Sequence, residues 1–195
     1  MEVGLKVKLR DVTSISTGYT FRSRLRYSSE GNFKVVQMKD LVDNSLVDCS
    51  ELLKTEIKGI KEHHILKKGD LVFRSRGQNL TAAIFPGNNN DVVLSSPLIK
   101  IRTKDNSILP EFLLWTINNH MSQKFLHSRL SGTHGGIVNS SELGDLPVSI
   151  PELKIQKLIV EIAALTEKEK FLASKISELK KAYISELLIK TSKGE

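Results

Sequence analysis

The stretch after Pro151 limits most strictly what this chain can fold into. Apolar side chains recur there at alternating steps of three and four residues, with one charged interruption at Glu169. Such steps place the side chains along one stripe of an α-helix, in the a/d pattern of a coiled coil. No Gly or Pro occurs from residue 155 to residue 188, so we predict one continuous helix. The stripe consists of Ile155, Leu158, Ile162, Leu165, Leu172, Ile176, Leu179 and Tyr183.

This helix needs a partner for its apolar stripe. At 1.5 Å per residue it extends for about 50 Å, which is more than a small domain covers. The rest of the sequence contains no second pattern of this kind. We therefore expect the helix to pair with another chain, which is either a second copy or a different chain with a similar helix. A curved helix packed on its own domain is the alternative.

Residues 1–150 predict a mixed α/β globular domain instead. Short apolar runs rich in β-branched residues alternate there with turn signals, which is typical of strands. Pro110 opens a segment with helical spacing, and we expect one helix that runs on to about Leu130. The expected strands are Phe33–Met38, Asp70–Phe73, Ala82–Phe85, Val92–Leu94 and Leu98–Arg102.

The composition fits a cytoplasmic protein. Hydrophobic residues make up 39% and charged residues 26% of the chain, as in soluble globular proteins. No apolar run approaches the roughly 20 residues that cross a bilayer, and the first residues lack the apolar stretch of a signal peptide. Cys49 is the only cysteine, which excludes a disulfide within the chain. We expect no contact with a membrane.

Positive charge is concentrated near the start of the chain. Lys and Arg number 29 against 22 Asp and Glu, a net charge of +7. Residues 1–39 hold eight basic and three acidic side chains, whereas residues 40–150 hold twelve of each. A surplus in one segment indicates a surface that faces a polyanion, and an ordinary solvated surface is the alternative.

Two groups of arginines stand out by their spacing. Arg22, Arg24 and Arg26 alternate with apolar residues, so they would share one face of an extended segment. Arg74 and Arg76 directly follow an apolar strand. Guanidinium groups bind phosphate or pair with guanine, and amide side chains pair with adenine. A solvated hairpin end with structural ion pairs is the alternative for the second group.

The sequence offers little for catalysis or metal binding. It lacks a methyltransferase motif, a Gly-rich cofactor fingerprint and an ATP-binding loop. Asp40 with residues 56–58 could imitate the carboxylates and lysine of a nuclease, but such sets are common by chance. The histidines do not converge with Cys49 in a zinc pattern. The glycine-rich residues 131–136 could cradle a phosphate or form a simple turn. We expect no catalytic centre and no metal.

Several short motifs follow one another in an order typical of a known family. In this order, and joined to a heptad helix, they resemble the DNA-specificity subunit of type I restriction-modification systems, namely one target-recognition domain with its conserved spacer helix. The motifs are Leu9-Arg10-Asp11-Val12, Gly18-Tyr19-Thr20-Phe21, Val35-Val36-Gln37-Met38-Lys39-Asp40-Leu41, Leu66-Lys67-Lys68-Gly69-Asp70-Leu71-Val72-Phe73 with Arg74-Ser75-Arg76-Gly77, Leu109-Pro110-Glu111-Phe112-Leu113, and Gly132-Thr133 with Leu146-Pro147-Val148.

The resemblance implies that residues 1–150 recognise double-stranded DNA. Phosphate contacts from the basic N-terminal segment would place the domain, and loop side chains would read bases. Residues 151–190 would form the spacer helix, and 191–195 a disordered tail. The residues expected to contact DNA are Tyr19, Thr20, Arg22, Arg24, Arg26, Lys39, Arg74, Ser75, Arg76, Gln78, Asn79, Thr133 and His134.

The resemblance also implies partners in a prokaryotic cytoplasm. Modification subunits would methylate adenine with S-adenosylmethionine, and a restriction subunit would use ATP and Mg²⁺, so this chain itself would hold no cofactor. Family members usually carry two recognition domains and two spacer helices, and this sequence has one of each. We therefore expect a half-subunit that pairs with a second specificity half. A stand-alone coiled-coil DNA-binding regulator or a decoy specificity fragment is the alternative.

Overall fold

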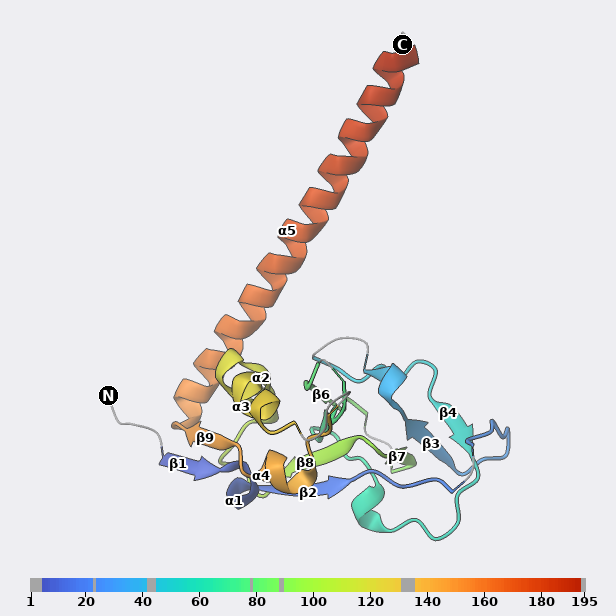
Figure 1. Ribbon diagram of the computed structural model, residues 1–195, viewed down its shortest axis with the longest axis vertical. Coiled ribbons are helices and arrows are strands. Elements are labelled where there is room, and N and C mark those ends of the chain that lie inside the picture. The colour runs from blue at the N-terminus through green and yellow to red at the C-terminus, as the bar shows by residue number, and fades with distance from the viewer. Residues whose placement is uncertain are drawn as a thin grey trace. The chain divides into compact units, whose positions relative to one another are not determined.

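The chain forms two units, Met1–Gln156 and Lys157–Glu195. The structure, a computed structural model, describes residues 5–22, 24–41, 45–77, 79–87, 90–130 and 136–193 (Figure 1). The first unit contains short strands and short helices, and the second is a single helix. A mixed α/β domain followed by a long C-terminal helix is the fold class predicted from the sequence, and it is confirmed.

A four-stranded antiparallel sheet forms one half of the domain. Its order is β2 (Thr13–Thr17), β8 (Ile99–Thr103), β5 (Leu71–Phe73) and β6 (Ala82–Ile84). Successive side chains of a strand point to opposite faces of the sheet. Because every side chain of β5 is buried, the sheet is covered on both faces at this strand.

A three-stranded sheet forms the other half, in the order β4 (Leu53–Thr55), β3 (Phe33–Val36) and β7 (Val92–Leu94). β3 pairs antiparallel with β4 but parallel with β7, so β3 and β7 end at the same edge. A separate antiparallel pair, β1 (Leu5–Lys8) with β9 (Pro147–Ile150), joins the two ends of the domain.

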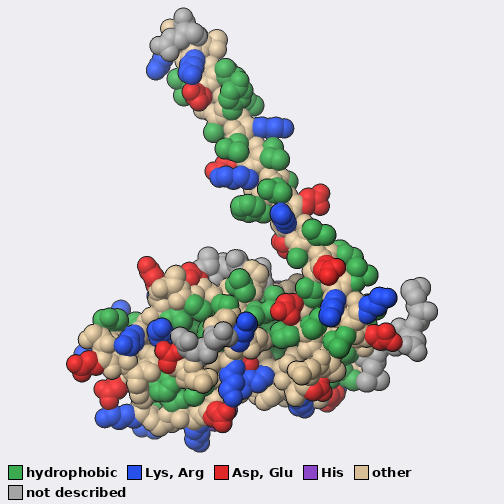
Figure 2. All heavy atoms as spheres, turned by 180° about the vertical axis from the view of Figure 1, so that it is seen from behind, with side chains coloured by type: hydrophobic (Ala, Val, Ile, Leu, Met, Phe, Trp, Pro, Cys, Tyr) green, Lys and Arg blue, Asp and Glu red, His purple; other side chains and the backbone are tan. Residues whose placement is uncertain are grey.

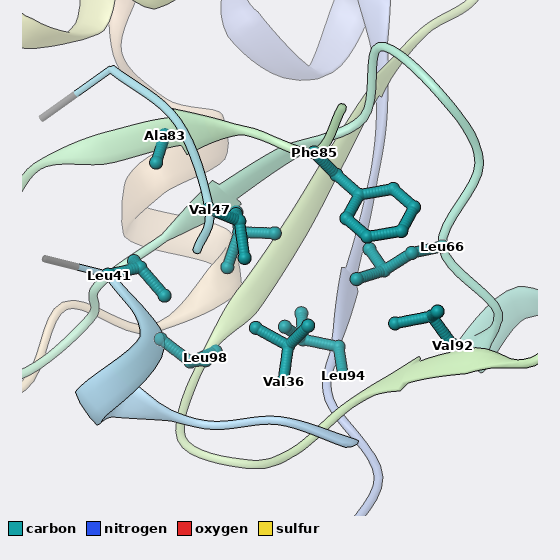
Figure 3. Packing of buried hydrophobic residues seen from close by; sticks show 10 residues of the cluster. Val36, Leu41, Val47, Leu66, Ala83, Phe85, Val92, Leu94 and Leu98 are labelled. Atoms are coloured by element: carbon teal, nitrogen blue, oxygen red, sulfur yellow. The ribbon is translucent and has the colours of Figure 1, made fainter. Parts of the chain in front are cut away.

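The two larger sheets share one hydrophobic core. Val36 and Leu94 come from the three-stranded sheet, and Val72 and Ala83 come from the four-stranded sheet. Loop residues such as Phe85 complete the cluster. Figure 3 shows Val36, Leu94 and Phe85 pointing into the same interior. At about 25 cal/mol per Å² of buried apolar area, burial of this cluster contributes favourably to folding of the domain.

The segment that begins at Pro110 is two helices rather than the one helix predicted. α2 (Pro110–Asn118) and α3 (His120–Ser128) are separated by Asn119, which has an extended backbone with φ −70° and ψ 159°. The Asn119 side chain accepts a hydrogen bond from the backbone N–H of Ser122 at 3.0 Å, so it caps α3. An N-cap residue such as Asn119 can start a new helix within a segment of helical apolar spacing. The spacing alone does not reveal such a break.

Four further short elements are α1 (Leu9–Val12), α4 (Ser140–Gly144) and the 3-10 helices η1 (Met38–Asp40) and η2 (Glu62–His64). The predicted strands are all present, with one or two residues trimmed at some ends. Strands β1, β2, β4 and β9 were not predicted. Their sequences are short, of three to five residues, and each contains at least one polar residue, so none has the continuous apolar run that marks a buried strand.

The long helix α5 runs from Leu153 to Lys193, about 60 Å at 1.5 Å per residue. Residues 191–193, predicted as tail, therefore belong to the helix, where the Thr191 hydroxyl donates to the carbonyl of Leu187. Figure 2 shows hydrophobic side chains recurring along α5 between Lys and Glu residues. Among the described residues, no helix is long and apolar enough to cross a bilayer.

The first turn of α5 is fastened to the domain by Gln156. This side chain is fully buried. Its Oε1 accepts from the backbone N–H of Leu109 at 2.9 Å, and its Nε2 donates to the carbonyls of Ser107 and Pro151, both at 2.8 Å. The buried amide is thus fully paired, and Gln156 holds the first turn of α5 to the backbone of residues 107–109 within the first unit.

Candidate nucleic-acid interface

The arginine-bearing segment 18–31 is fastened at both edges of the three-stranded sheet. At one end, a Cβ on Gly18 would lie 2.4 Å from the carbonyl carbon of Ser95, so only glycine allows this approach to the end of β7. At the other end, a Cβ on Gly31 would lie 2.6 Å from backbone atoms of Thr55 in β4. Hydrogen bonds from Tyr19 N–H to the Leu94 carbonyl at 2.6 Å and from Ser28 N–H to the Lys54 carbonyl at 2.9 Å reinforce the two ends.

Between these ends the segment buries one set of side chains and exposes another. Tyr19, Phe21 and Leu25 pack against a small cluster formed by Val35, Ile57 and Val93. Arg22, Arg24 and Arg26 are exposed, as the alternation predicted. Tyr27 is 71% exposed instead of facing inward, because the chain turns from Ser28 to Gly31.

The three arginines carry uncompensated positive charge. None of them forms an ion pair with a described residue. Their backbone is held by the apolar contacts of Phe21 and Leu25, while the guanidinium groups remain hydrated. A row of cations on a positioned segment can bind successive phosphates of a polyanion.

Two open hollows lie beside this segment, and Phe21 and Leu25 contribute to both. The first hollow, of about 420 Å³, is lined by Thr20, Phe21, Leu25, Gln37, Met38, Ser95 and Ser96. The second hollow, of about 380 Å³, is lined by Phe21, Arg24, Leu25, Arg26, Thr55 and Glu56. The predicted DNA contact Thr20 therefore lies on the first hollow, and Arg24 and Arg26 lie on the second.

The second arginine group is built differently from the first. Arg74 is half-buried, and its Nη2 donates to the carbonyls of Leu41 at 2.6 Å and Met38 at 3.3 Å. Ser75 is buried, and its hydroxyl donates to the Pro97 carbonyl at 2.5 Å. Both side chains hold neighbouring loops in place through the Nη2 of Arg74 and the hydroxyl of Ser75. These contacts within the protein argue against the predicted contacts of Arg74 and Ser75 with DNA.

The other residues predicted to contact DNA differ in their exposure. Arg76 and Asn79 are exposed in the loop after β5, where Gly77 has a positive φ of 100°. Lys39 is exposed, with its ammonium 3.9 Å from a carboxylate oxygen of Asp40. Tyr19 is half-buried and packs edge-on against Phe21, so it supports the segment from below. Gln78, Thr133 and His134 lie outside the described residues.

The Gly-Asp motif before β5 is structural. The Asp70 carboxylate is 1% exposed and accepts two hydrogen bonds of 2.6 Å from the Arg102 guanidinium. It also accepts the backbone N–H of Lys67 at 2.7 Å, which closes the turn that contains Gly69. Asp70 thus ties this turn to β8, and the hydrogen bonds raise the pKa of Arg102.

A buried lysine lies on the same strand. Lys100 is 5% exposed, and its ammonium donates to the carbonyls of His63 and Ile65 in and after η2. Burial lowers the pKa of Lys100 to about 8. Burial, followed by the charge of His63, also lowers the pKa of His64, whose ring packs edge-on against Tyr19. These groups connect η2 to the sheet.

The side chains that could imitate a nuclease have separate structural partners. Asp40 is buried and accepts the backbone N–H of Gln37 at 2.7 Å, and burial raises its pKa. Glu56 lies 3.4 Å from the ammonium of Lys58 at the surface. Within the part of the chain that the structure describes, no group of three His, Cys, Asp or Glu residues could hold a metal ion.

Comparison with known families identifies this architecture. The model of the type I restriction modification DNA specificity domain matches residues 3–181. The chain belongs to this family. The match covers the domain, the arginine-bearing segment and most of α5, so the resemblance drawn from the short motifs is confirmed. A comparison with curated protein sequences finds no match.

Solved structures of specificity subunits share the fold. A chain from work on complex assembly and conformational transition of the type I R-M system has a TM-score of 0.68 at 17% identity, over 96% of this chain and 44% of that one. The HsdS subunit from Thermoanaerobacter tengcongensis has a TM-score of 0.57 at 18% identity, over 89% and 39%. The S subunit from M. genitalium has a TM-score of 0.52 at 12% identity, over 89% and 42%. The chain thus spans less than half the length of each.

Proposed function

We propose that this chain recognises one half of a bipartite DNA target as a type I specificity protein. The observation that carries the proposal is the row of Arg22, Arg24 and Arg26, which are exposed and form no ion pair with a described residue, on a segment fastened across a sheet. Membership in the DNA-specificity family supports the identity of the polyanion. The arginines bind phosphates and position the domain, and side chains beside them read bases.

The proposed partner of α5 is a second specificity half. The a/d stripe is exposed along the whole helix, with Leu165 66% and Leu179 60% exposed. A stripe of this size stays in water only at a large free-energy cost, so it is expected to pack against another long helix. Antiparallel pairing of two copies would place two DNA-reading domains at opposite ends of the rod.

Membership in the DNA-specificity family supports a wider assembly with partner subunits. Modification subunits would bring S-adenosylmethionine and methylate adenine, and a restriction subunit would bring ATP and Mg²⁺. This chain would recognise the DNA target sequence and would carry out no catalytic step. Its target would be two short inverted half-sites separated by a non-specific gap, with a spacing set by the length of the paired helices.

Selection of bound DNA from a random pool by the full chain tests the proposal. The expected result is enrichment of two inverted half-sites at one fixed spacing. Enrichment of no sequence would contradict DNA recognition. A single uninterrupted site would contradict the role of α5 in setting the spacing, and would favour a stand-alone DNA-binding regulator.

A substitution in the stripe tests the pairing. The double variant Leu165→Asp, Leu172→Asp places charges in an apolar interface and should convert dimers into monomers in sedimentation experiments. The domain should remain folded, because neither residue lies within it. Exposed Lys157→Asp and Lys181→Asp, which lie off the stripe, form the matched control. Wild-type protein that sediments as a monomer at tens of micromolar would contradict pairing with a second copy.

A further inference from the structure

The first hollow lies where the two parallel strands β3 and β7 end. Ser95, directly after β7, donates both its N–H at 3.0 Å and its hydroxyl at 2.8 Å to the carbonyl of Val36, the last residue of β3. The two strand ends are therefore locked together. Gln37 and Ser96, the neighbours of these residues, are thereby placed on the wall of the same hollow.

A third wall comes from the arginine-bearing segment. Ser96 N–H donates to the Tyr19 carbonyl at 2.9 Å, and Tyr19 and Ser95 form an isolated parallel bridge. This pairing fixes Thr20, which is exposed at the hollow, next to Ser96. Three polar side chains, Thr20, Gln37 and Ser96, thus come together from segments that are far apart in the sequence.

The backbone under Gln37 is held rigidly. Its N–H donates to the buried Asp40 carboxylate at 2.7 Å, and its carbonyl accepts the Asp40 N–H at 3.0 Å. Because this backbone is already fixed, a ligand that binds the Gln37 side chain does not have to order the backbone, which lowers the entropic cost of binding. Phe21, Leu25 and Met38 give the hollow an apolar lining beside these polar groups.

Charge decides what the first hollow can take. Among the described residues that line it none is acidic, whereas Glu56 lines the second hollow. Two exposed cations flank the hollow in the sequence: Arg22 follows the lining residue Phe21, and Lys39 follows the lining residue Met38. A polyanion that lies along these cations brings its neutral base edges, rather than its phosphates, to the uncharged polar walls. The occupant that fits is therefore DNA with its bases toward Gln37.

We propose that the first hollow is a base-reading site in which Gln37 is a specificity-determining residue, assisted by the hydroxyls of Thr20 and Ser96. The Gln37 amide offers one acceptor and two donors, the set that pairs bidentately with N6 and N7 of adenine in the major groove. This inference rests on the proposed function, because it assumes that the segment 18–31 lies on DNA.

The test compares random-pool selections by the full-length wild type, Gln37→Ala and Gln37→Glu. Gln37→Ala should lose discrimination at one base pair by about 5- to 150-fold, the value of a good bidentate contact. The dependence of affinity on salt should stay unchanged, because no phosphate contact is lost. Gln37→Glu should shift preference at the same position from adenine toward cytosine, whose N4 amino group donates to a carboxylate.

Controls separate the possible failures. Asn106→Ala removes an exposed amide from the turn after β8 and should select the wild-type sequence. Thermal unfolding of each variant shows that the fold is kept, and Gln37→Glu preserves the side-chain shape. If both Gln37 variants select the wild-type sequence with unchanged discrimination, the base-reading role of Gln37 is overturned and the proposed function stands. If wild type selects no sequence, the proposed function itself fails.

Discussion

The two arginine groups look alike in the sequence and are used differently in the structure. Arg22, Arg24 and Arg26 are exposed and have no ion pair with a described residue. Arg74 turns inward and donates to two backbone carbonyls. In each group a phenylalanine, Phe21 or Phe73, is followed by Arg-Ser-Arg. The comparison shows that backbone carbonyls close to an arginine determine whether its guanidinium group is available to a ligand.

The physical reason lies in the carbonyl groups that each segment passes. Residues 38–41 form a short 3-10 helix and its C-cap, and the carbonyls of Met38 and Leu41 lie within reach of the Arg74 guanidinium and accept hydrogen bonds from it. Segment 18–31 passes strands β3 and β7, whose backbone groups already pair with neighbouring strands. Arg22, Arg24 and Arg26 form no hydrogen bond to a carbonyl of a described residue, and their side chains are exposed.

The largest expected effect concerns the charge that is most firmly paired inside the domain. Asp70→Ala removes a buried carboxylate that binds Arg102 and the Lys67 N–H, and should lower the free energy of unfolding by about 3 kcal/mol. Urea unfolding measures this. Asp105→Ala, an exposed carboxylate that binds only Ser107 in its own turn, is the control and should cost far less. Equal losses would show that burial does not distinguish these charges.

The next effect separates the two arginines of one loop. Arg74→Ala leaves the carbonyls of Met38 and Leu41 without donors and should cost about 1.5–3 kcal/mol of stability, without changing which DNA sequence is selected. Arg76→Ala should change stability by less than about 0.5 kcal/mol and relax preference at particular base pairs by about 1–3 kcal/mol. Urea unfolding and pool selection on both variants measure this. The opposite pattern would reverse our assignment of the loop.

A smaller effect follows from the buried lysine. Because the pKa of Lys100 falls from its ordinary 10.5 to about 8, the folded protein binds fewer protons than the unfolded chain between these pH values. The stability difference between wild type and Lys100→Met should therefore shift in favour of wild type as pH rises from 8 to 10. Urea unfolding across this range measures it. Parallel pH curves would show that Lys100 is not desolvated.

The sequence predicts the parts of the fold that local patterns determine. Apolar β-branched runs such as Val92–Leu94 predict strands, and the a/d spacing predicts α5. The polar strand Thr13–Thr17 escapes prediction, because its pairing with β8 comes from the distant residues 99–103. The break at Asn119 escapes because a capping hydrogen bond competes with helical spacing.

The candidate site was predictable to a similar degree. The exposure of Arg22, Arg24 and Arg26 follows from their alternation with apolar residues. The inward turn of Arg74 depends on carbonyls more than thirty residues away, so no local pattern shows it. The sequence did not single out Gln37 and Ser96 as site residues. Each is an isolated polar residue, and only the pairing of β3 with β7 brings the two together at one hollow.

The central claim is that Arg22, Arg24 and Arg26 bind DNA phosphates, and the salt dependence of binding tests it most directly. The logarithm of affinity falls with the logarithm of salt concentration by about 0.9 for each phosphate contact. Replacing all three arginines with Ala should therefore flatten this slope by about 2.7 and weaken binding to matched and scrambled DNA alike. Lys157, Lys181 and Lys193 on α5, replaced together, remove the same charge and should leave the slope nearly unchanged. An arginine triple variant with the wild-type slope would contradict the account.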